Sequence, residues 1–396
     1  MKILIITPRI PFPPYRGDKL KIFNIAKILS KKNNVTILTF RRSFRQQAEI
    51  EELKALGFNI ITIRLTLIES LFRAFLAFFS NTPFQVAWYQ SSKMKKKVQQ
   101  ISSEYDVVYY HLVRSAQYLP DGKGTKVLSV LDFTDAVSLY LTRMAIAERN
   151  LFKKFFIRIE KRRISEYEVI AEKFNTLFVC SNVDKKFLAD SGIKVNIELL
   201  NNGIDTEYFN YENNQYKLNR IIFTGNMPYY PNQDAAVYFA KEILPLISRE
   251  IPATKFYIVG QKPPMKIKRL VNDKIKVSGF VPDIRKEYLK SAVNVAPMRF
   301  GAGTLNKVIE AIALGVPTVA SSIAVQGLPE ELKKYILIAD DPVTFADAVK
   351  EIMNNSEKYR AEMLEGLNII KELLSWEKVV KEFEKSLMMK LAVLHK

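Results

Sequence analysis

The chain alternates short apolar runs with segments of helical periodicity along almost its whole length, and this order restricts the fold more than any other feature. Near the start, an apolar run at 2–6 is followed by helical periodicity over 20–29 and by a second apolar run at 35–40. Continuous apolar runs of this length are typical of strands that are buried on both faces of a parallel sheet. Their alternation with helices predicts an open parallel sheet that is covered on both sides.

The predicted strands form two groups, separated by the turn-rich segment 201–205. The first group is expected at 2–6, 35–40, 59–65, 106–110, 126–131, 176–180 and 196–200. The second group is expected at 220–224, 255–259, 275–280, 293–298, 317–320 and 335–339. A chain of 396 residues suits two domains of about 150–200 residues. The sequence thus predicts an α/β protein of two Rossmann-like domains, 1–202 and 203–375, with a last helix at 376–396 that packs back on the first.

Cysteine and histidine are scarce, which restricts metal chemistry. The one cysteine, Cys180, excludes an intramolecular disulfide and a cysteine-rich metal site, and its apolar neighbours predict a buried strand. The two histidines, His111 and His395, make a histidine-ligated zinc centre improbable. The chain also has no Asp-x-Asp pair. We therefore expect no metal and no cofactor.

The net charge of +19 indicates negatively charged partners. The segment 65–79 is apolar but too short to span a bilayer, and as a helix it would carry four phenylalanines on a broad apolar face. The segment 149–163 interleaves aromatic and basic residues. Both suit helices that lie in the headgroup plane of an anionic membrane. A core helix followed by a solvated basic helix is the alternative.

The sequence also gives expectations for nucleic-acid binding and for the cellular compartment. No nucleic-acid recognition motif accompanies the positive charge, so we expect no nucleic-acid partner. The first residues enter a predicted strand directly, without the pattern of a signal peptide. We expect a cytoplasmic protein that binds peripherally to the inner face of the membrane.

The segment 295–311 carries the strongest functional signal, because a predicted strand ends there, glycines follow and a helix begins. Gly301 and Gly303 would let the backbone approach an anion, toward which the N–H groups of the helix start point. Arg299 and Lys307 would neutralise a diphosphate. Lys307 and Glu310 are three residues apart and share a helix face, so Glu310 would accept hydrogen bonds from ribose hydroxyls.

In this context the sequence resembles the large family-four group of retaining glycosyltransferases with the GT-B fold, in the subgroup with a Gly-x-Gly-x-x-x-Lys donor motif. The resemblance is carried in order by 13–19 (PPYRGDK), 106–111 (DVVYYH), 202–205 (NGID), 223–227 (FTGNM), 259–260 (VG), 279–284 (GFVPDI) and 295–327. It implies two domains that face each other across a cleft. It also implies transfer of a sugar, of hexosyltransferase type, from a nucleotide-diphosphate donor to a glycan or lipid-linked acceptor, in cell-surface polysaccharide or glycoconjugate synthesis.

The resemblance and the positions of the predicted strands also assign residues to a site. His111 ends the fourth strand at the sheet's switch point, where related enzymes have a histidine that lines the sugar site. Asp132 ends the next strand and would bind a sugar hydroxyl or the acceptor. Hydrogen bonding within the domain is the alternative for His111, and helix capping is the alternative for Asp132. The expected donor contacts are Gly17, Asp18, Asn226, Arg299, Gly301, Gly303, Thr304, Leu305, Lys307 and Glu310.

The sequence departs from the family pattern at two places. Many members have a second glutamate eight residues before the one matched by Glu310, and Ala302 stands there. Many also carry an arginine and a lysine after the first strand of the second domain, where Asn226, Pro231 and Asn232 stand. We expect Arg299 and Lys307 to replace these cations. The departures leave two other functions open: a non-catalytic nucleotide-sugar-binding partner of a glycan-assembly complex, and a GT-B sugar-nucleotide epimerase.

Overall fold

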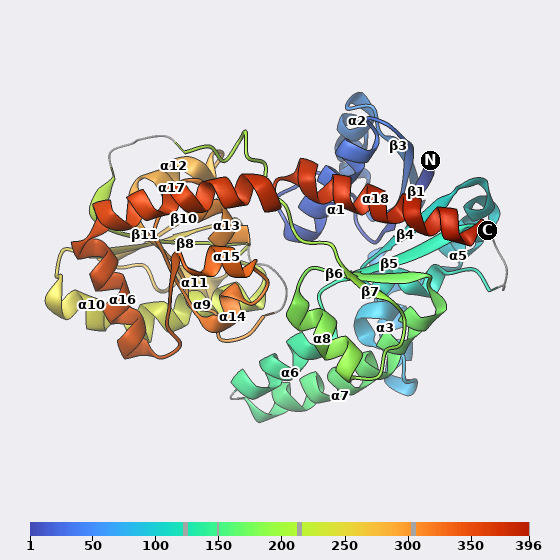
Figure 1. Ribbon diagram of the computed structural model, residues 1–396. Coiled ribbons are helices and arrows are strands. Elements are labelled where there is room, and N and C mark those ends of the chain that lie inside the picture. The colour runs from blue at the N-terminus through green and yellow to red at the C-terminus, as the bar shows by residue number, and fades with distance from the viewer. Residues whose placement is uncertain (122–125, 149, 212–215, 302–305, 396) are drawn as a thin grey trace. The chain divides into compact units, whose positions relative to one another are not determined.

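The computed structural model describes residues 1–121, 126–148, 150–211, 216–301 and 306–395. The chain divides into two units (Figure 1). Unit 1 contains Met1–Asn201 and Trp376–Lys396, and unit 2 contains Asn202–Ser375. Each unit is an α/β domain built on a parallel sheet, so the prediction of two Rossmann-like domains is confirmed.

Unit 1 contains a sheet of seven described strands in the order β3-β2-β1-β4-β5-β6-β7, and every neighbouring pair is parallel. Its strands are β1 (Lys2–Thr7), β2 (Asn34–Arg41), β3 (Asn59–Arg64), β4 (Val107–His111), β5 (Leu128–Thr134), β6 (Thr176–Val179) and β7 (Ile197–Leu199). They form where the apolar runs were predicted to form strands.

The helices of unit 1 cover both faces of this sheet, because alternate residues of a strand point to opposite faces. They are α1 (Gly17–Leu29), α2 (Gln47–Ala55), α3 (Leu67–Leu76), α4 (Phe84–Ala87), α5 (Ser92–Ile101), α6 (Val137–Ala147), α7 (Leu151–Glu168), α8 (Asn182–Asp190) and α18 (Trp376–Leu394). Short 3-10 turns are η1 (Phe44–Gln46), η2 (Ala77–Phe79), η3 (Ser102–Glu104), η4 (Val113–Tyr118) and η5 (Val169–Lys173). Ile3 and Ile5 of β1 pack with α1, α2 and α18, whereas Leu4 and Ile6 pack with α5 and α8. In Figure 1 the red helix α18 lies along α1.

Unit 2 contains a sheet of six described parallel strands in the order β10-β9-β8-β11-β12-β13. Its strands are β8 (Lys217–Thr224), β9 (Lys255–Val259), β10 (Ile275–Gly279), β11 (Ser291–Ala296), β12 (Thr318–Ala320) and β13 (Ile336–Ile338). Its helices are α9 (Tyr230–Tyr238), the π-helical turn η6 (Phe239–Ile243), α10 (Leu244–Glu250), α11 (Met265–Lys268), α12 (Ile284–Leu289), α13 (Asn306–Ala313), α14 (Ser322–Val325), α15 (Glu330–Lys333), α16 (Pro342–Asn354) and α17 (Ser356–Leu373).

Each sheet has a switch point, where the strand order reverses direction. In unit 1 it lies between β1 and β4, and in unit 2 between β8 and β11. Open α/β sheets bind ligands outside the carboxyl ends of their strands at such points. We therefore expect ligand-binding residues to follow β1, β4, β8 and β11.

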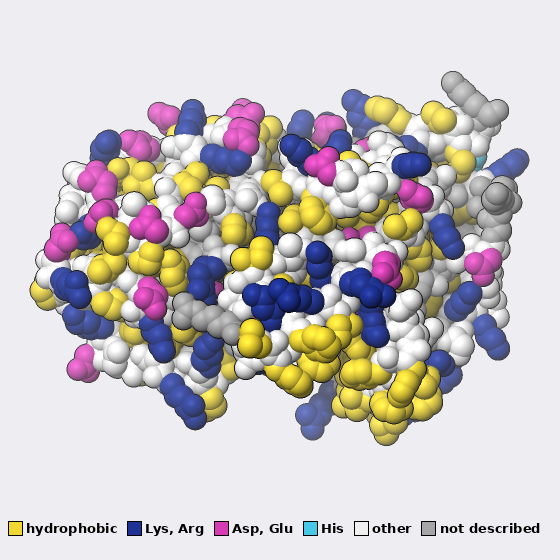
Figure 2. Space-filling model, turned by 90° about the horizontal axis from the view of Figure 1, so that it is seen from below, with side chains coloured by type: hydrophobic (Ala, Val, Ile, Leu, Met, Phe, Trp, Pro, Cys, Tyr) yellow, Lys and Arg dark blue, Asp and Glu magenta, His cyan; other side chains and the backbone are white. Residues whose placement is uncertain are grey.

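The segment 65–79 forms α3 and η2, and the alternative of a core helix is wrong. Thr66 and Glu69 form a capping box at the start of α3, and Ser70 is the buried residue of this helix. The phenylalanines remain on the surface, with Phe75 exposed by 57% and Phe79 by 78%. Figure 2 shows hydrophobic side chains (yellow) gathered on one part of the molecular surface, with lysines and arginines (dark blue) nearby.

The start of α7 also carries exposed apolar side chains. Phe152 and Phe155 of α7 are exposed. Arg163, further along α7, donates a hydrogen bond to the Ala77 carbonyl oxygen at 2.9 Å, which ties the helix to η2. We refer to the exposed apolar side chains of α3, η2 and the first turns of α7 as the α3–α7 surface. Within the described residues, every helix is too short or too polar to cross a bilayer.

Candidate functional site

The carboxyl end of β8 forms a tightly packed corner with the ends of neighbouring elements in unit 2. A Cβ atom at Gly225 would lie 2.7 Å from Asn232 Nδ2, and one at Gly260 would lie 1.8 Å from the Gly225 carbonyl oxygen. Only glycine permits these approaches. Asn226 follows, and its carbonyl oxygen accepts a hydrogen bond from Asn232 Nδ2 at 3.0 Å. Asn232 therefore holds the loop after β8 in place.

The Lys307 amine is buried at the switch point of unit 2. Its Nζ donates to Asn232 Oδ1 at 2.7 Å and lies 4.0 Å from the centroid of the Phe223 ring. Burial lowers the pKa of Lys307 to about 7, although the nearby Glu310 carboxylate acts in the opposite direction. A lysine with this pKa gains its proton readily when an anion binds beside it. Asn232, which stands where the family resemblance would have placed a cation, thus contacts the lysine that we expected to replace that cation.

Glu310 lies one turn further along α13 and is held by a tyrosine. Tyr288 donates to Glu310 Oε2 at 3.0 Å, and its hydroxyl also lies 2.5 Å from Thr224 Oγ1 at the end of β8. Burial raises the pKa of Glu310, while the Tyr288 hydrogen bond and the Lys307 charge oppose that rise. The structure thus brings Lys307 and Glu310 to the same strand ends.

Arg299 has a partner that the sequence did not reveal. Its guanidinium forms two hydrogen bonds to Asp234 of α9, Nε to Oδ2 at 2.8 Å and Nη2 to Oδ1 at 2.5 Å. The same guanidinium lies 4.9 Å from the centroid of the Tyr238 ring. Its charge is therefore already paired in this structure, and its predicted contact with a diphosphate remains a prediction.

The glycine loop after β11 is described only at its start. Gly301 is buried, and a Cβ atom there would meet open space. The predicted donor contacts Gly303, Thr304 and Leu305, together with Ala302, lie outside the described residues.

His111 lies at the switch point of unit 1. β1 and β4 pair in register up to Ile6 and Tyr110, and the next residues contact each other, with Thr7 Oγ1 3.0 Å from His111 Nδ1. Burial lowers the pKa of His111 to about 4, so the ring is neutral at physiological pH. Its Nε2 is buried and has no hydrogen-bond partner among the described residues. A neutral imidazole with one unused nitrogen can contact a ligand hydroxyl.

Asp132 is fully buried in an ion pair, an arrangement that the sequence did not predict. Its Oδ2 lies 2.8 Å from Lys21 Nζ and also accepts a hydrogen bond from the Tyr109 hydroxyl. Lys21 Nζ donates further to the Leu200 carbonyl oxygen at 3.1 Å. Burial acts to raise the pKa of Asp132, but the charge of Lys21 and the hydrogen bonds from Lys21 and Tyr109 outweigh it and lower the pKa. Asp132 is thus an ionised carboxylate whose partner comes from α1.

Asp18 lies at the start of α1, after Gly17, the first residue of the helix. It forms ion pairs with Arg9 and with Arg16, the latter at 3.1 Å. Burial acts to raise the pKa of Asp18, but the two guanidinium groups outweigh it and lower the pKa to about 2. A Cβ atom at Gly17 would meet no atom within 4 Å. The backbone at Gly17 therefore has open space beside it, as a close approach to a diphosphate requires.

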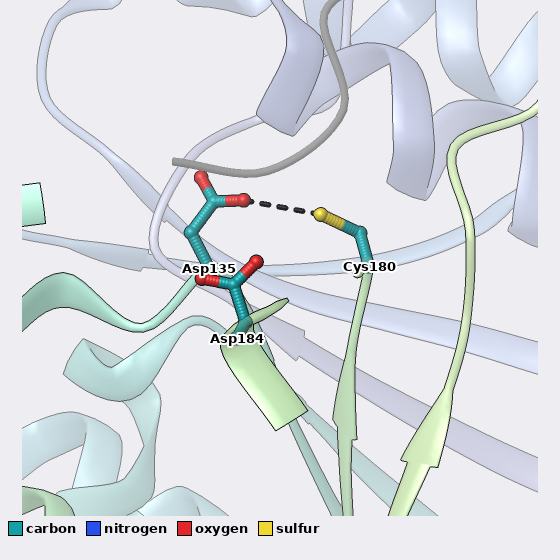
Figure 3. A group of neighbouring side chains, drawn as sticks. All are labelled: Asp135, Cys180 and Asp184. Carbon is teal, nitrogen blue, oxygen red and sulfur yellow. Dashed lines mark hydrogen bonds between the residues drawn. The ribbon is translucent and has the colours of Figure 1, made fainter. Parts of the chain in front are cut away.

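Two aspartates and the cysteine form a cluster where β5, β6 and α8 meet (Figure 3). Asp135, Cys180 and Asp184 place their potential ligand atoms within 4.8 Å of one another. Burial raises the pKa of Asp135 to about 7 and the pKa of the Cys180 thiol far above its usual value. The thiol donates to Asp135 Oδ1 at 3.1 Å, and Asp184 accepts from the Ala136 backbone N–H at 3.0 Å. These hydrogen bonds explain the cluster without a metal ion, which would require a deprotonated thiol.

The comparisons with known proteins agree on the fold. Residues 219–355 match the family model described as "Glycosyl transferases group 1". A protein of Klebsiella pneumoniae, described as an uncharacterized 44.6 kDa protein in the cps region, is 24% identical over 380 residues, which cover 90% of this chain and 91% of that protein. The matched residues lie within unit 2.

Solved structures match over both units. HepE of Anabaena in complex with UDP-glucose aligns with a TM-score of 0.68 at 14% identity, covering 98% of this chain and all of that one. Sucrose-phosphate synthase of Thermosynechococcus elongatus aligns with a TM-score of 0.72 at 14% identity, covering 99% of this chain and 100% of that one. The two parallel-sheet domains thus have the GT-B fold of these enzymes.

Proposed function

We propose that the protein is a retaining glycosyltransferase of hexosyltransferase type, which uses a nucleotide-diphosphate sugar as donor. The observation that carries the proposal is the pair formed by Lys307 and Glu310 on α13, at the switch point of the unit that matches the glycosyltransferase family model. A buried cation and a carboxylate one turn apart suit a ligand that combines a diphosphate with ribose hydroxyls. The complex of the Anabaena neighbour with UDP-glucose supports such a donor.

In this proposal each group acts on one part of the donor. Lys307 becomes fully protonated as the diphosphate binds and stabilises the negative charge that develops on the leaving group. Glu310 accepts hydrogen bonds from the ribose, while Gly301 and the predicted N–H donors of Gly303 and Thr304 contact the phosphates. In unit 1, His111 contacts a sugar hydroxyl through Nε2, and Gly17 gives the diphosphate access to the backbone. No metal takes part in the proposed reaction.

The proposal is tested by binding and turnover. Purified protein should be stabilised against thermal unfolding by one nucleoside diphosphate of a panel, and by the corresponding sugar nucleotide, because a ligand of the native state raises its stability. Lys307→Ala should weaken that binding by about 1–3 kcal/mol, the range for a hydrogen bond to a charged group. Lys371→Ala, an exposed lysine on α17, is the matched control.

The second measurement is multiple-turnover transfer of the sugar. Binding without turnover on any acceptor would favour the non-catalytic partner, which the pairing of Arg299 with Asp234 also supports. Epimerisation of the sugar nucleotide without an acceptor would favour the epimerase. Unchanged affinity in Lys307→Ala would remove Lys307 from the donor site.

We further propose that the acceptor is a glycan or a lipid-linked sugar, and that the protein works at the cytoplasmic face of a membrane in polysaccharide or glycoconjugate synthesis. The location of the Klebsiella relative in a capsule (cps) region supports this role. The α3–α7 surface supports membrane contact, because its phenylalanines are exposed to water. Basic side chains accompany it, with Lys93, Lys95 and Lys96 exposed on α5 and others on α7. Each would contribute about 1 kcal/mol near an anionic bilayer.

A further inference from the structure

Three arginines surround one buried tyrosine at the carboxyl edge of the unit 1 sheet. The Cζ atoms of Arg9, Arg42 and Arg114 lie 5.6, 5.0 and 5.8 Å from the centroid of the Tyr89 ring. These arginines follow β1, β2 and β4, which are adjacent in the sheet. Positive charge is therefore concentrated where an open α/β sheet binds its ligands.

Two of these arginines have only neutral side-chain partners. Arg42 Nη1 donates to Ser70 Oγ at 3.2 Å, and Arg114 Nη2 donates to Gln85 Oε1 at 3.0 Å. Neither forms an ion pair within the described ranges, whereas Arg9 is paired with Asp18. Burial, and then the charge of Arg9, lowers the pKa of Arg114. Among the described residues, neither guanidinium is thus in direct contact with a carboxylate, and Asp18 acts on Arg114 only through longer-range electrostatics.

Both guanidinium groups also have an unused donor. In the part of the chain that the structure describes, Arg42 Nη2 and Arg114 Nε are buried and have no hydrogen-bond partner. A buried N–H group without an acceptor is costly, and the cost is greater on a charged group. Two such donors in one cationic cluster call for an anion with several oxygen atoms.

We propose that Arg42 and Arg114 bind a phosphate group that the acceptor carries, beside Tyr89. This inference rests on the proposed function, since it assigns the substrate class of the same transfer reaction. A phosphate provides several charged oxygens and matches the planar fork of a guanidinium, which a sugar hydroxyl does not. Arg42 and Arg114 are partly exposed as whole residues, although these two donor atoms are buried.

The phosphate can belong to a lipid or to a soluble sugar phosphate, and the surroundings favour the lipid. Ser70, the partner of Arg42, lies on α3, and Gln85, the partner of Arg114, lies on α4. Phe78 of η2 packs against Phe84 of α4, with ring centroids 4.7 Å apart. Arg42 therefore contacts α3, which carries part of the α3–α7 surface. Arg114 contacts α4, which packs against η2 of the same surface.

The experiment measures phosphate binding by calorimetry on the full chain, with the donor site saturated by the nucleoside diphosphate found in the panel. The probes are glycerol 3-phosphate and monomeric dihexanoyl phosphatidic acid, which present the same phosphate without and with acyl chains. Arg42→Met and Arg114→Met should each weaken binding by about tenfold or more. Arg45→Met, which removes an exposed arginine on η1, should bind like the parent.

If the phosphatidic acid binds more tightly than glycerol 3-phosphate, the phosphate belongs to a lipid. If the two probes bind equally, the acceptor is a soluble sugar phosphate. The inference is overturned if Arg114→Met binds both probes like the parent, or if the nucleotide displaces them competitively. Thermal unfolding of each variant shows whether it folds. Arg114→Lys keeps the charge but loses the planar fork, so its affinity for the probes should lie between those of the parent and of Arg114→Met. A parent that binds the probes but no nucleotide would refute the proposed function alone.

Discussion

Replacement of Asp132 by alanine should destabilise unit 1 strongly, because it leaves a buried lysine without its counter-ion. The side chains of Lys21 and Asp132 are 1% and 0% exposed, and among the described residues Lys21 Nζ would retain the Leu200 carbonyl oxygen as its one hydrogen-bond partner. The Tyr109 hydroxyl would also lose its acceptor. Removal of one member of a buried ion pair costs about 3–5 kcal/mol. For a domain of this size the melting temperature falls by about 2–4 °C per kcal/mol, so we expect a decrease of about 6–20 °C.

Tryptophan fluorescence gives an assay that reports on unit 1 alone. The chain has two tryptophans, Trp88 and Trp376, and both belong to unit 1. Thermal and urea unfolding followed at this signal should show the loss in Asp132→Ala and no loss in Asp190→Ala, which changes an exposed aspartate on α8. A loss below about 1 kcal/mol in Asp132→Ala would refute the reasoning, because that is the range of an exposed pair.

The partner residue offers a second check. Lys21→Met alone should also destabilise unit 1, since Asp132 would then be the unpaired charge. The double variant Lys21→Met/Asp132→Ala should recover much of the stability, because replacement of a whole buried pair by apolar groups is often nearly neutral. Additive losses in the double variant would show that the two side chains do not interact.

The pH dependence follows from the lowered pKa of Asp132. A carboxylate with a pKa below its unfolded value of about 3.9 contributes its stability above that value and loses it as the pH falls through the folded pKa. The difference between parent and Asp132→Ala should therefore be constant from about pH 5 to 8 and shrink below about pH 4. If folded Asp132→Asn transfers sugar at the parental rate, the role of Asp132 is structural rather than catalytic.

Four further outcomes are expected. Affinity for the nucleoside diphosphate should fall as the pH rises above the Lys307 pKa of about 7, with proton uptake in calorimetry at pH 8; affinity independent of pH would contradict this. Glu310→Gln should lower donor affinity but hardly change the melting temperature, since Tyr288 can donate to the amide oxygen; a large loss of stability would make Glu310 structural. Activity should survive excess EDTA, and a loss that Mg²⁺ reverses would contradict metal-free transfer. Binding to anionic vesicles should fall with ionic strength, and Phe75→Ser/Phe79→Ser should weaken it even at low salt; a parent that ignores such vesicles would exclude the membrane contact.

The fold was predictable because its signal is local. A strand that is buried on both faces is apolar through its centre, as residues 3–6 of β1 are, and each such run formed a strand. The placement of His111 at a switch point followed from strand order. The exposure of α3 could not be predicted, because an amphipathic helix has the same sequence pattern whether its apolar face packs on a protein core or contacts a membrane.

The partners within the site could not be predicted, because they come from distant segments. Arg299 and Asp234 are 65 residues apart. In the sequence, nothing distinguishes Lys21 from an exposed lysine of a surface helix. Its contact with Asp132 depends on how α1 packs against the sheet. Asn232 was noted as a departure from the family pattern, but its contact with the Lys307 amine depends on the corner at Gly225. Such pairings decide which charges remain available for a ligand.

The return of α18 to unit 1 affects how the protein is made. Trp376, Phe383 and Leu387 lie in the same hydrophobic cluster as the strands β1 and β4, although all of unit 2 separates them from those strands in the chain. During synthesis from the N-terminus, unit 1 cannot complete this cluster until the ribosome has translated unit 2 and then α18. Unit 2 consists of one continuous segment and can fold first, while part of the apolar face of unit 1 remains exposed to water. A nascent chain stalled before residue 376 should therefore bind chaperones through unit 1.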